Sequence, residues 1–172
     1  IYYDVNIPSG LTNYPVISVA DATCHSVTIN TGASLTMQSN RQLTLDPCSS
    51  SSSFSNSGTF SAGTGTETVV FNGSGTVSGT TGTTFNQVTI KGGVDFKSSS
   101  PYSTISKQLE IQSGGYVTTG AAPYYSTGSI LMYNTGGSFT AGEEWFPNNI
   151  CSNRGVPYHV TITGSTSLSL GS

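Results

Sequence analysis

The sequence repeats itself at long range. Val27-Thr28-Ile29 returns as Val88-Thr89-Ile90 and again as Val160-Thr161-Ile162. Neighbouring segments recur in the same order, since Gln42-Leu43-Thr44-Leu45 reappears as Gln108-Leu109-Glu110-Ile111. Self-similar blocks in a fixed order are typical of stacked repeat proteins, in which each unit packs only on its neighbours.

The repeats divide the chain into a short N-terminal segment and a repeat region. Residues 1–20 are expected to form a strand or capping segment, because Pro8, Gly10 and Pro15 separate them from the first repeat. Residues 21–172 are expected to form the repeats. Their blocks cover about residues 27–87, 88–159 and, incomplete, 160–172.

The composition favours strands over helices. The 172 residues include 21 glycines, and only 8% are charged. Short strings alternate around Val, Ile, Leu, Phe and Tyr between Gly, Asn and Ser, and no window has apolar residues at helical spacing. Ser49 to Ser53 taken alone would suit a disordered linker, but 10% aromatic residues argue against disorder of the whole chain.

Two all-β architectures compete. A sandwich or jelly roll could use Asn72-Gly73 and Gly82 in hairpin turns, but its strands run longer and do not recur in ordered blocks. In a solenoid each strand pairs with its equivalent in the next coil, roughly 4.8 Å away. We therefore predict an all-β parallel β-helix (β-solenoid) of about six or seven coils with no substantial helix. Val27, Val88 and Val160 are expected to stack on one face.

Alternation within the strands predicts a narrow apolar core. Thr28, Thr44, Thr89 and Thr161 should point outward. The residues expected to point inward are Val27, Ile29, Leu43, Leu45, Phe60, Phe71, Val88, Ile90, Leu109, Ile111, Tyr133, Phe139, Val160 and Ile162.

A thin core of this kind is open at both ends unless something covers it. Residues 1–7 form an apolar strand string with no partner in their own repeat, and the last repeat breaks off after two inward leucines. The prediction is a self-associating structural module whose coils stack head to tail as a homopolymer. The alternative is that further repeats of the same polypeptide supply the next coil. The expected polymer contacts are Ile1, Tyr2, Tyr3, Val5, Ile7, Leu168 and Leu170.

No catalytic, metal or cofactor site is predicted. The acidic residues are mostly single, and Glu143 and Glu144 would point to opposite faces of a strand, which does not suit a glycosidase pair. His25 and His159 precede the Val-Thr-Ile triplet by different spacings, so they are interpreted as solvated histidines. We therefore expect no enzyme.

Aromatic residues gather in the least repetitive insertions. Tyr124, Tyr125, Trp145 and Phe146 could stack on sugar rings, which gives a glycan-binding surface module as the alternative function. The same rings could instead pack on a neighbouring coil. Ice binding is a weaker alternative, because the outward positions are not a regular threonine array.

Three cysteines fit no zinc spacing. Cys24 and Cys48 flank the strands of the first repeat and predict a disulfide in an oxidising compartment, with Cys151 unpaired or joined to another chain. The five Lys and Arg residues form no basic stripe, which argues against nucleic acid as a partner. No run is long and apolar enough to predict a membrane span.

Several segments are similar to a known class of repeats. Asn13-Tyr14-Pro15-Val16-Ile17, Cys24 to Ala33, Phe71-Asn72-Gly73-Ser74-Gly75 and Phe85-Asn86-Gln87-Val88-Thr89-Ile90 resemble the β-solenoid repeats of large secreted surface proteins of Bacteroidota. The resemblance implies a parallel β-helix exported to the cell surface or the medium, often as one section of a longer polypeptide. It implies no single activity, because such repeats serve as stalks, adhesins and matrix components.

Overall fold

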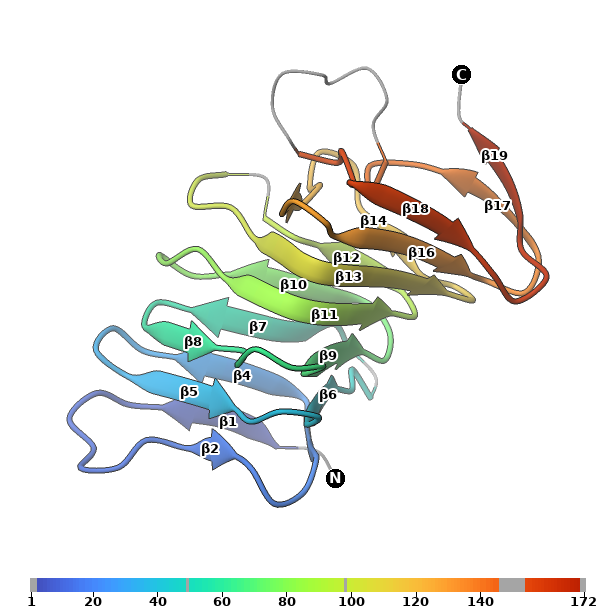
Figure 1. Cartoon of the computed structure of the whole chain (residues 1–172). Helices are drawn as coiled ribbons and strands as arrows, with labels where there is room; N and C mark the ends of the chain where they lie inside the picture. The colour runs from blue at the N-terminus through green and yellow to red at the C-terminus, as the bar shows by residue number, and fades with distance from the viewer. Residues whose placement is uncertain (1–2, 49, 98, 146–153, 171–172) are drawn as a thin grey trace.

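The chain winds into a parallel β-solenoid of about six turns (Figure 1). The structure is a computed structural model and describes residues 3–48, 50–97, 99–145 and 154–170. Within these residues there is no helix, and so none that is long and apolar enough to cross a membrane. The predicted fold class is confirmed.

Two sheets run along most of the solenoid, and all ladders between their strands are parallel. Sheet A consists of β1 (Asp4–Ile7), β4 (Ser26–Ile29), β7 (Ser52–Asn56), β10 (Gly75–Ser78), β12 (Gly93–Asp95) and β14 (Tyr116–Val117). Sheet C consists of β3 (Ala22–Cys24), β6 (Gln42–Leu45), β9 (Thr68–Phe71), β11 (Thr84–Ile90), β13 (Thr104–Gln112), β16 (Ile130–Asn134) and β18 (His159–Ile162), and β15 (Tyr124–Tyr125) also pairs with β13.

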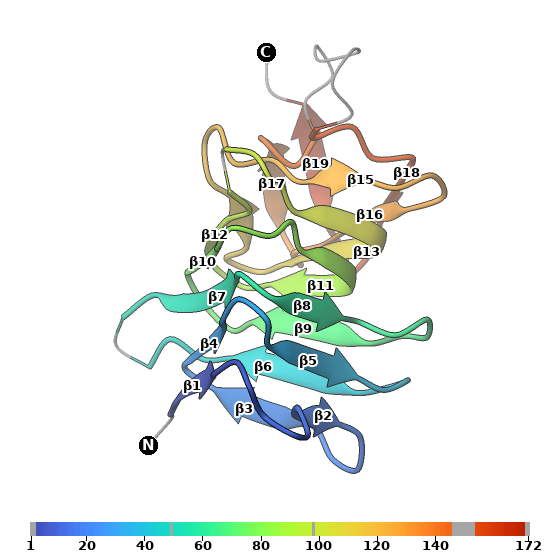
Figure 2. The same cartoon turned by 90° about the vertical axis from the view of Figure 1, so that its left-hand side faces the viewer.

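Two shorter sheets complete the coils. Sheet B contains β2 (Val16–Ile17), β5 (Ser34–Met37) and β8 (Thr59–Ser61), and sheet D contains β17 (Ser138–Ala141) and β19 (Ser167–Leu170). Figure 2 shows sheet B beside sheet C in the early coils, where β2, β5 and β8 lie one above another. Residues 1–20, the predicted capping segment, thus supply β1 and β2 to the first coil.

The core follows the predicted alternation through the middle of the solenoid. Ten of the predicted inward residues are buried, and Phe60, Phe139 and Val160 are half-buried against the same core. The buried ten are Val27, Ile29, Leu43, Leu45, Phe71, Val88, Ile90, Leu109, Ile111 and Tyr133. The prediction is wrong for Ile162, which is 51% exposed. Ile162 lies in β18, the last strand of its sheet in the described residues, so no further coil covers it there.

The predicted stack of three valines is also wrong. Val88 and Val160 share sheet C, but Val27 lies in β4 of sheet A and pairs with Phe54. The structural unit is a single coil, with paired residues separated by 19 positions between Val69 and Val88 and by 29 between Leu131 and Val160. Strands of sheets A and C have the same alternation of inward and outward residues, so the triplet alone does not identify the face.

Candidate functional site

The first coil presents three strand edges. Among the described residues, β1 pairs only with β4, β2 only with β5 and β3 only with β6. Asp4–Ile7 is therefore not an unpaired strand, because as β1 it pairs with β4 of the next coil. The other edge of each of these three strands can still pair with an added strand through its backbone N–H and C=O groups.

The strands farthest from the first coil present three more edges. Within the described part of the chain, β14 pairs only with β12, β18 only with β16 and β19 only with β17. Figure 1 places the first coil and the β18 and β19 strands at opposite ends of the stack. An added strand at either end would continue a parallel ladder.

Exposed apolar side chains concentrate at these ends. Nine large hydrophobic or tyrosine side chains are exposed in the described residues, and eight of them belong to the first coil or to residues 154–170. Tyr116, in β14 at the far edge of sheet A, is the exception. The eight are Tyr3, Val5, Leu11, Val16 and Val19 at the first coil and Tyr158, Ile162 and Leu170 at the other end.

The predicted polymer contacts divide into available and unavailable side chains. Tyr3, Val5 and Leu170 are exposed by 72%, 38% and 57%. Ile7 is buried, and Leu168 is half-buried against the core, so neither offers much apolar surface. Ile1 and Tyr2 lie outside the described residues.

A shallow polar groove of about 290 Å³ lies on the outer face of sheet C. It crosses β6, β9, β11 and β13, and four glutamines line it: Gln42, Gln87, Gln108 and Gln112. Thr68, Val70, Thr89, Lys91 and Glu110 complete the lining. Gln42, Thr68, Gln87 and Gln108 are register partners, so they form one rank across four coils.

Hydrogen bonds between neighbouring coils and within β13 hold the side chains of this groove. The Thr68 hydroxyl donates to Gln87 Oε1 at 3.1 Å, and the Thr89 hydroxyl donates to Glu110 Oε2 at 3.4 Å. Gln112 Nε2 donates to Glu110 Oε1 at 3.0 Å. The predicted outward direction of Thr89 agrees with these contacts, although neighbouring side chains leave it only 8% exposed. The sequence interpretation missed this groove, and the signal was the recurrence of glutamine before an alternating strand at Gln42, Gln87 and Gln108.

The aromatic residues proposed from sequence as a glycan surface are not gathered on one exposed face. Tyr125 is buried, and its hydroxyl donates to the backbone carbonyl of Glu144 at 2.9 Å. Trp145 packs, half-buried, against the core, and the Tyr124 ring lies 5.3 Å from the Tyr102 ring, tilted by 58°. Phe146 lies outside the described residues. Tyr125 and Trp145 therefore pack within the protein, which is the alternative that the sequence left open for these rings.

Two glutamates are buried and hydrogen-bonded. Glu144 accepts hydrogen bonds from the Tyr133 hydroxyl at 3.1 Å and from the Gly142 N–H at 2.8 Å. Burial, followed by the charge of Glu144, raises the pKa of both Tyr125 and Tyr133, so both hydroxyls remain protonated donors. The second glutamate, Glu67, accepts hydrogen bonds from Asn86 Nδ2 and the Gly65 N–H. Both carboxylates therefore hold local structure within the solenoid. In the described residues no group of three His, Cys, Asp or Glu side chains is placed to hold a metal ion.

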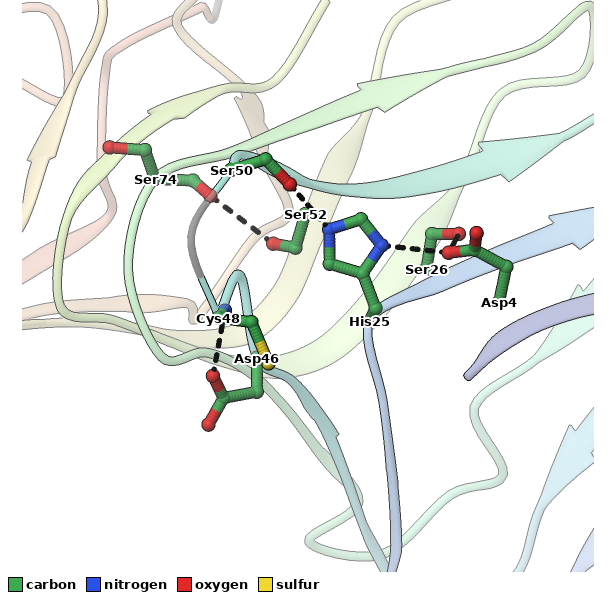
Figure 3. Close-up of polar contacts among 8 residues, drawn as sticks. All are labelled: Asp4, His25, Ser26, Asp46, Cys48, Ser50, Ser52 and Ser74. Atoms are coloured by element: carbon green, nitrogen blue, oxygen red, sulfur yellow. Dashed lines mark hydrogen bonds and ion pairs between the residues drawn. The ribbon is translucent and has the colours of Figure 1, made fainter. Parts of the chain in front are cut away.

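His25, directly before β4, connects β1 to the segment before β7 (Figure 3). Its Nδ1 lies 2.7 Å from Asp4 Oδ1, and its Nε2 lies 2.9 Å from the Ser50 hydroxyl. Hydrogen bonds from Ser26 and His25 lower the pKa of Asp4. A carboxylate, an imidazole and a hydroxyl are hydrogen-bonded here in the same order as in a catalytic triad. The Asp of a catalytic triad is buried, whereas the Asp4 side chain is 72% exposed. We interpret the cluster as a clasp between β1, β4 and the segment before β7.

The second predicted solvated histidine, His159, is exposed in β18. His25 differs, because its side chain is only 25% exposed and bonded on both ring nitrogens. Sequence reasoning could not find the clasp, since Asp4 and Ser50 lie 21 and 25 residues away.

The predicted disulfide is not formed in this structure. Cys24 and Cys48 are both free; Cys24 is buried at the end of β3, and Cys48 is exposed. Cys48 has a φ of 54°, and its N–H donates to Asp46 Oδ1 at 3.1 Å, which keeps it in a surface turn. Burial, with a smaller contribution from the charge of Asp4, raises the pKa of Cys24 to about 11. Cys151 lies outside the described residues.

No protein-family model, curated protein or solved structure matches this chain.

Proposed function

We propose that this chain is a structural, self-associating module of the extracellular space or cell surface, a component of a filament, stalk or adhesin, that stacks end to end through its terminal coils. The observation that carries the proposal is the placement of exposed apolar side chains. Eight of the nine are at the two ends of the solenoid, beside the strand edges.

The end residues that point inward are the best candidates for the contact. Val5 pairs with buried Val27, and Ile162 pairs with buried Tyr133, so each occupies a core position whose outer side is covered by no further coil of the described residues. Full burial of such a side chain stabilises by about 1.5–3 kcal/mol. Association costs at least about 4 kcal/mol in lost freedom, so several end side chains and the backbone ladder must act together.

The symmetry of this contact determines the assembly. The first coil of one copy would meet the last coil of another, which is a heterologous contact that does not close on itself and builds an open filament. In a longer polypeptide the same edges would receive further repeats of the same chain. The resemblance to secreted Bacteroidota repeats supports an extracellular or cell-surface location under either arrangement.

Sedimentation velocity over a range of concentrations, with negative-stain microscopy, tests the proposal. The unmodified chain should form species that grow with concentration and appear as rods. Val5→Lys and Ile162→Lys each place a charge at one end and should each reduce the product to monomers. Thr76→Lys is the matched control, because it places a charge on an exposed residue of β10, a strand that is paired on both sides in sheet A.

A mixing experiment then identifies the contact as head to tail. The Val5→Lys copy retains an unmodified last coil, and the Ile162→Lys copy retains an unmodified first coil, so their mixture should give dimers that neither variant forms alone. Far-UV circular dichroism verifies that all variants are folded. A monodisperse monomer at every concentration, or an equal effect of Thr76→Lys, would overturn the proposal.

A further inference from the structure

We propose that the groove on the outer face of sheet C binds a neutral, extended oligosaccharide, lying across the strands and parallel to the axis of the solenoid. This site is on the side of the stack and is independent of the proposed end-to-end assembly. Its position follows from the four strands that it crosses, β6, β9, β11 and β13.

The groove has the chemistry of sugar recognition. An amide both donates and accepts hydrogen bonds, as does a sugar hydroxyl, and four of the nine lining residues are glutamines. Lys91 and Glu110 are the two charged residues of the lining, and their charges are opposite, so the groove as a whole favours neither an anion nor a cation. Val70 adds a small apolar area at the base, against which the CH groups of a sugar ring can lie.

Hydrogen bonds between coils and within β13 orient the groups that would meet the ligand. Gln87 Oε1 accepts from Thr68, which leaves the Gln87 amide N–H groups as donors toward the groove. Gln112 Nε2 donates to Glu110, which leaves Gln112 Oε1 as an acceptor. Preorganised polar groups lose less conformational entropy on binding than mobile ones.

The groove has an equivalent polar residue on each of four adjacent strands, which favours a polymeric ligand. Gln87 and Gln108 are neighbours in one rank, and strands are spaced by roughly 4.8 Å, so the four strands span about 14 Å. A single sugar can contact only one or two ranks, whereas a chain of several sugars can contact all four. Affinity should therefore rise with chain length and level off once the ligand spans the four strands.

The test uses isothermal titration calorimetry with neutral gluco-, xylo- and manno-oligosaccharides of one to six sugars, and with oligogalacturonate as the anionic arm. At least one neutral series should bind saturably, with affinity that increases to about four sugars. Gln87→Ala and Gln108→Ala should each weaken that binding about tenfold or more. Gln38→Ala, at an exposed glutamine outside the groove, should leave it unchanged.

Three results would overturn the inference: no saturable binding of any neutral series, tighter binding of oligogalacturonate, or equal losses in Gln38→Ala and the groove variants. The test is separable from that of the proposed function. The monomeric Val5→Lys protein should retain glycan binding, and Gln87→Ala should retain end-to-end assembly.

Discussion

Tyr133 and Ile162 are paired residues on adjacent strands of sheet C, yet Tyr133 is fully buried and Ile162 is 51% exposed. The two occupy equivalent positions in successive coils, so their intrinsic side-chain direction is the same. The difference is that β16 is covered by β18, whereas within the described residues β18 is at the edge of its sheet. Burial in this fold is therefore provided by the next coil.

This relationship predicts unequal costs for the same substitution at two positions. Ile90 is fully buried, so Ile90→Ala should lower the free energy of unfolding by about 2–5 kcal/mol. Ile162→Ala should cost the monomer about 1 kcal/mol or less, because half of the side chain is already in water. Urea denaturation of dilute, monomeric protein measures both. Equal losses would mean that Ile162 is buried in that state.

The fold class was predictable because each strand carries its own signal. Alternation places Leu43 and Leu45 inside without any knowledge of their neighbours. The sheet to which each strand belongs was less predictable. Val27 lies in sheet A although its triplet recurs in sheet C, because coils differ in length and strands of both sheets have the same alternation of inward and outward residues. The clasp of Asp4, His25 and Ser50 and the rank of Gln42, Thr68, Gln87 and Gln108 depend on the register between coils, which loop lengths determine.

Two coils approach so closely at Gly92 that this position should not accept a side chain. A Cβ at Gly92 would overlap the backbone of Gly73 and Ser74 in the coil before, whereas a Cβ at Gly137 would meet no atom. Gly92→Ala should therefore destabilise by roughly 1–3 kcal/mol through forced backbone displacement, and Gly137→Ala should have little effect. Thermal unfolding of the two variants provides the comparison. A neutral Gly92→Ala would show that the coils can separate at low cost.

The two described cysteines should differ in reactivity. Cys48 is exposed and should be alkylated by iodoacetamide in the native protein, whereas Cys24 is buried with a pKa of about 11 and should react only after unfolding. Peptide mapping by mass spectrometry separates both from Cys151. Recovery of a peptide that links Cys24 and Cys48 from native protein would instead support the disulfide expected from the sequence.

Glu67 should make stability depend on pH. Its carboxylate accepts hydrogen bonds from Asn86 Nδ2 at 2.5 Å and from the Gly65 N–H at 3.0 Å, and it connects the turn before β9 to the irregular part of β11. Burial alone would raise the pKa of Glu67. The bonds from Asn86, the backbone and Ser39 outweigh burial and lower it below its ordinary value of 4.5.

A lowered pKa means that the folded state binds this proton less readily than the unfolded chain. The stabilisation is therefore fully present above about pH 4.5 and is lost as the pH falls through the folded-state pKa. Urea denaturation from pH 7 to pH 3 should show that Glu67→Gln is less stable than the unmodified protein at pH 7, with a difference that shrinks in acid. Asn86→Ala should reduce this pH dependence, because it removes the bond that favours the charged form. A stability difference between the unmodified protein and Glu67→Gln that stays constant over this range would contradict the role assigned to the carboxylate.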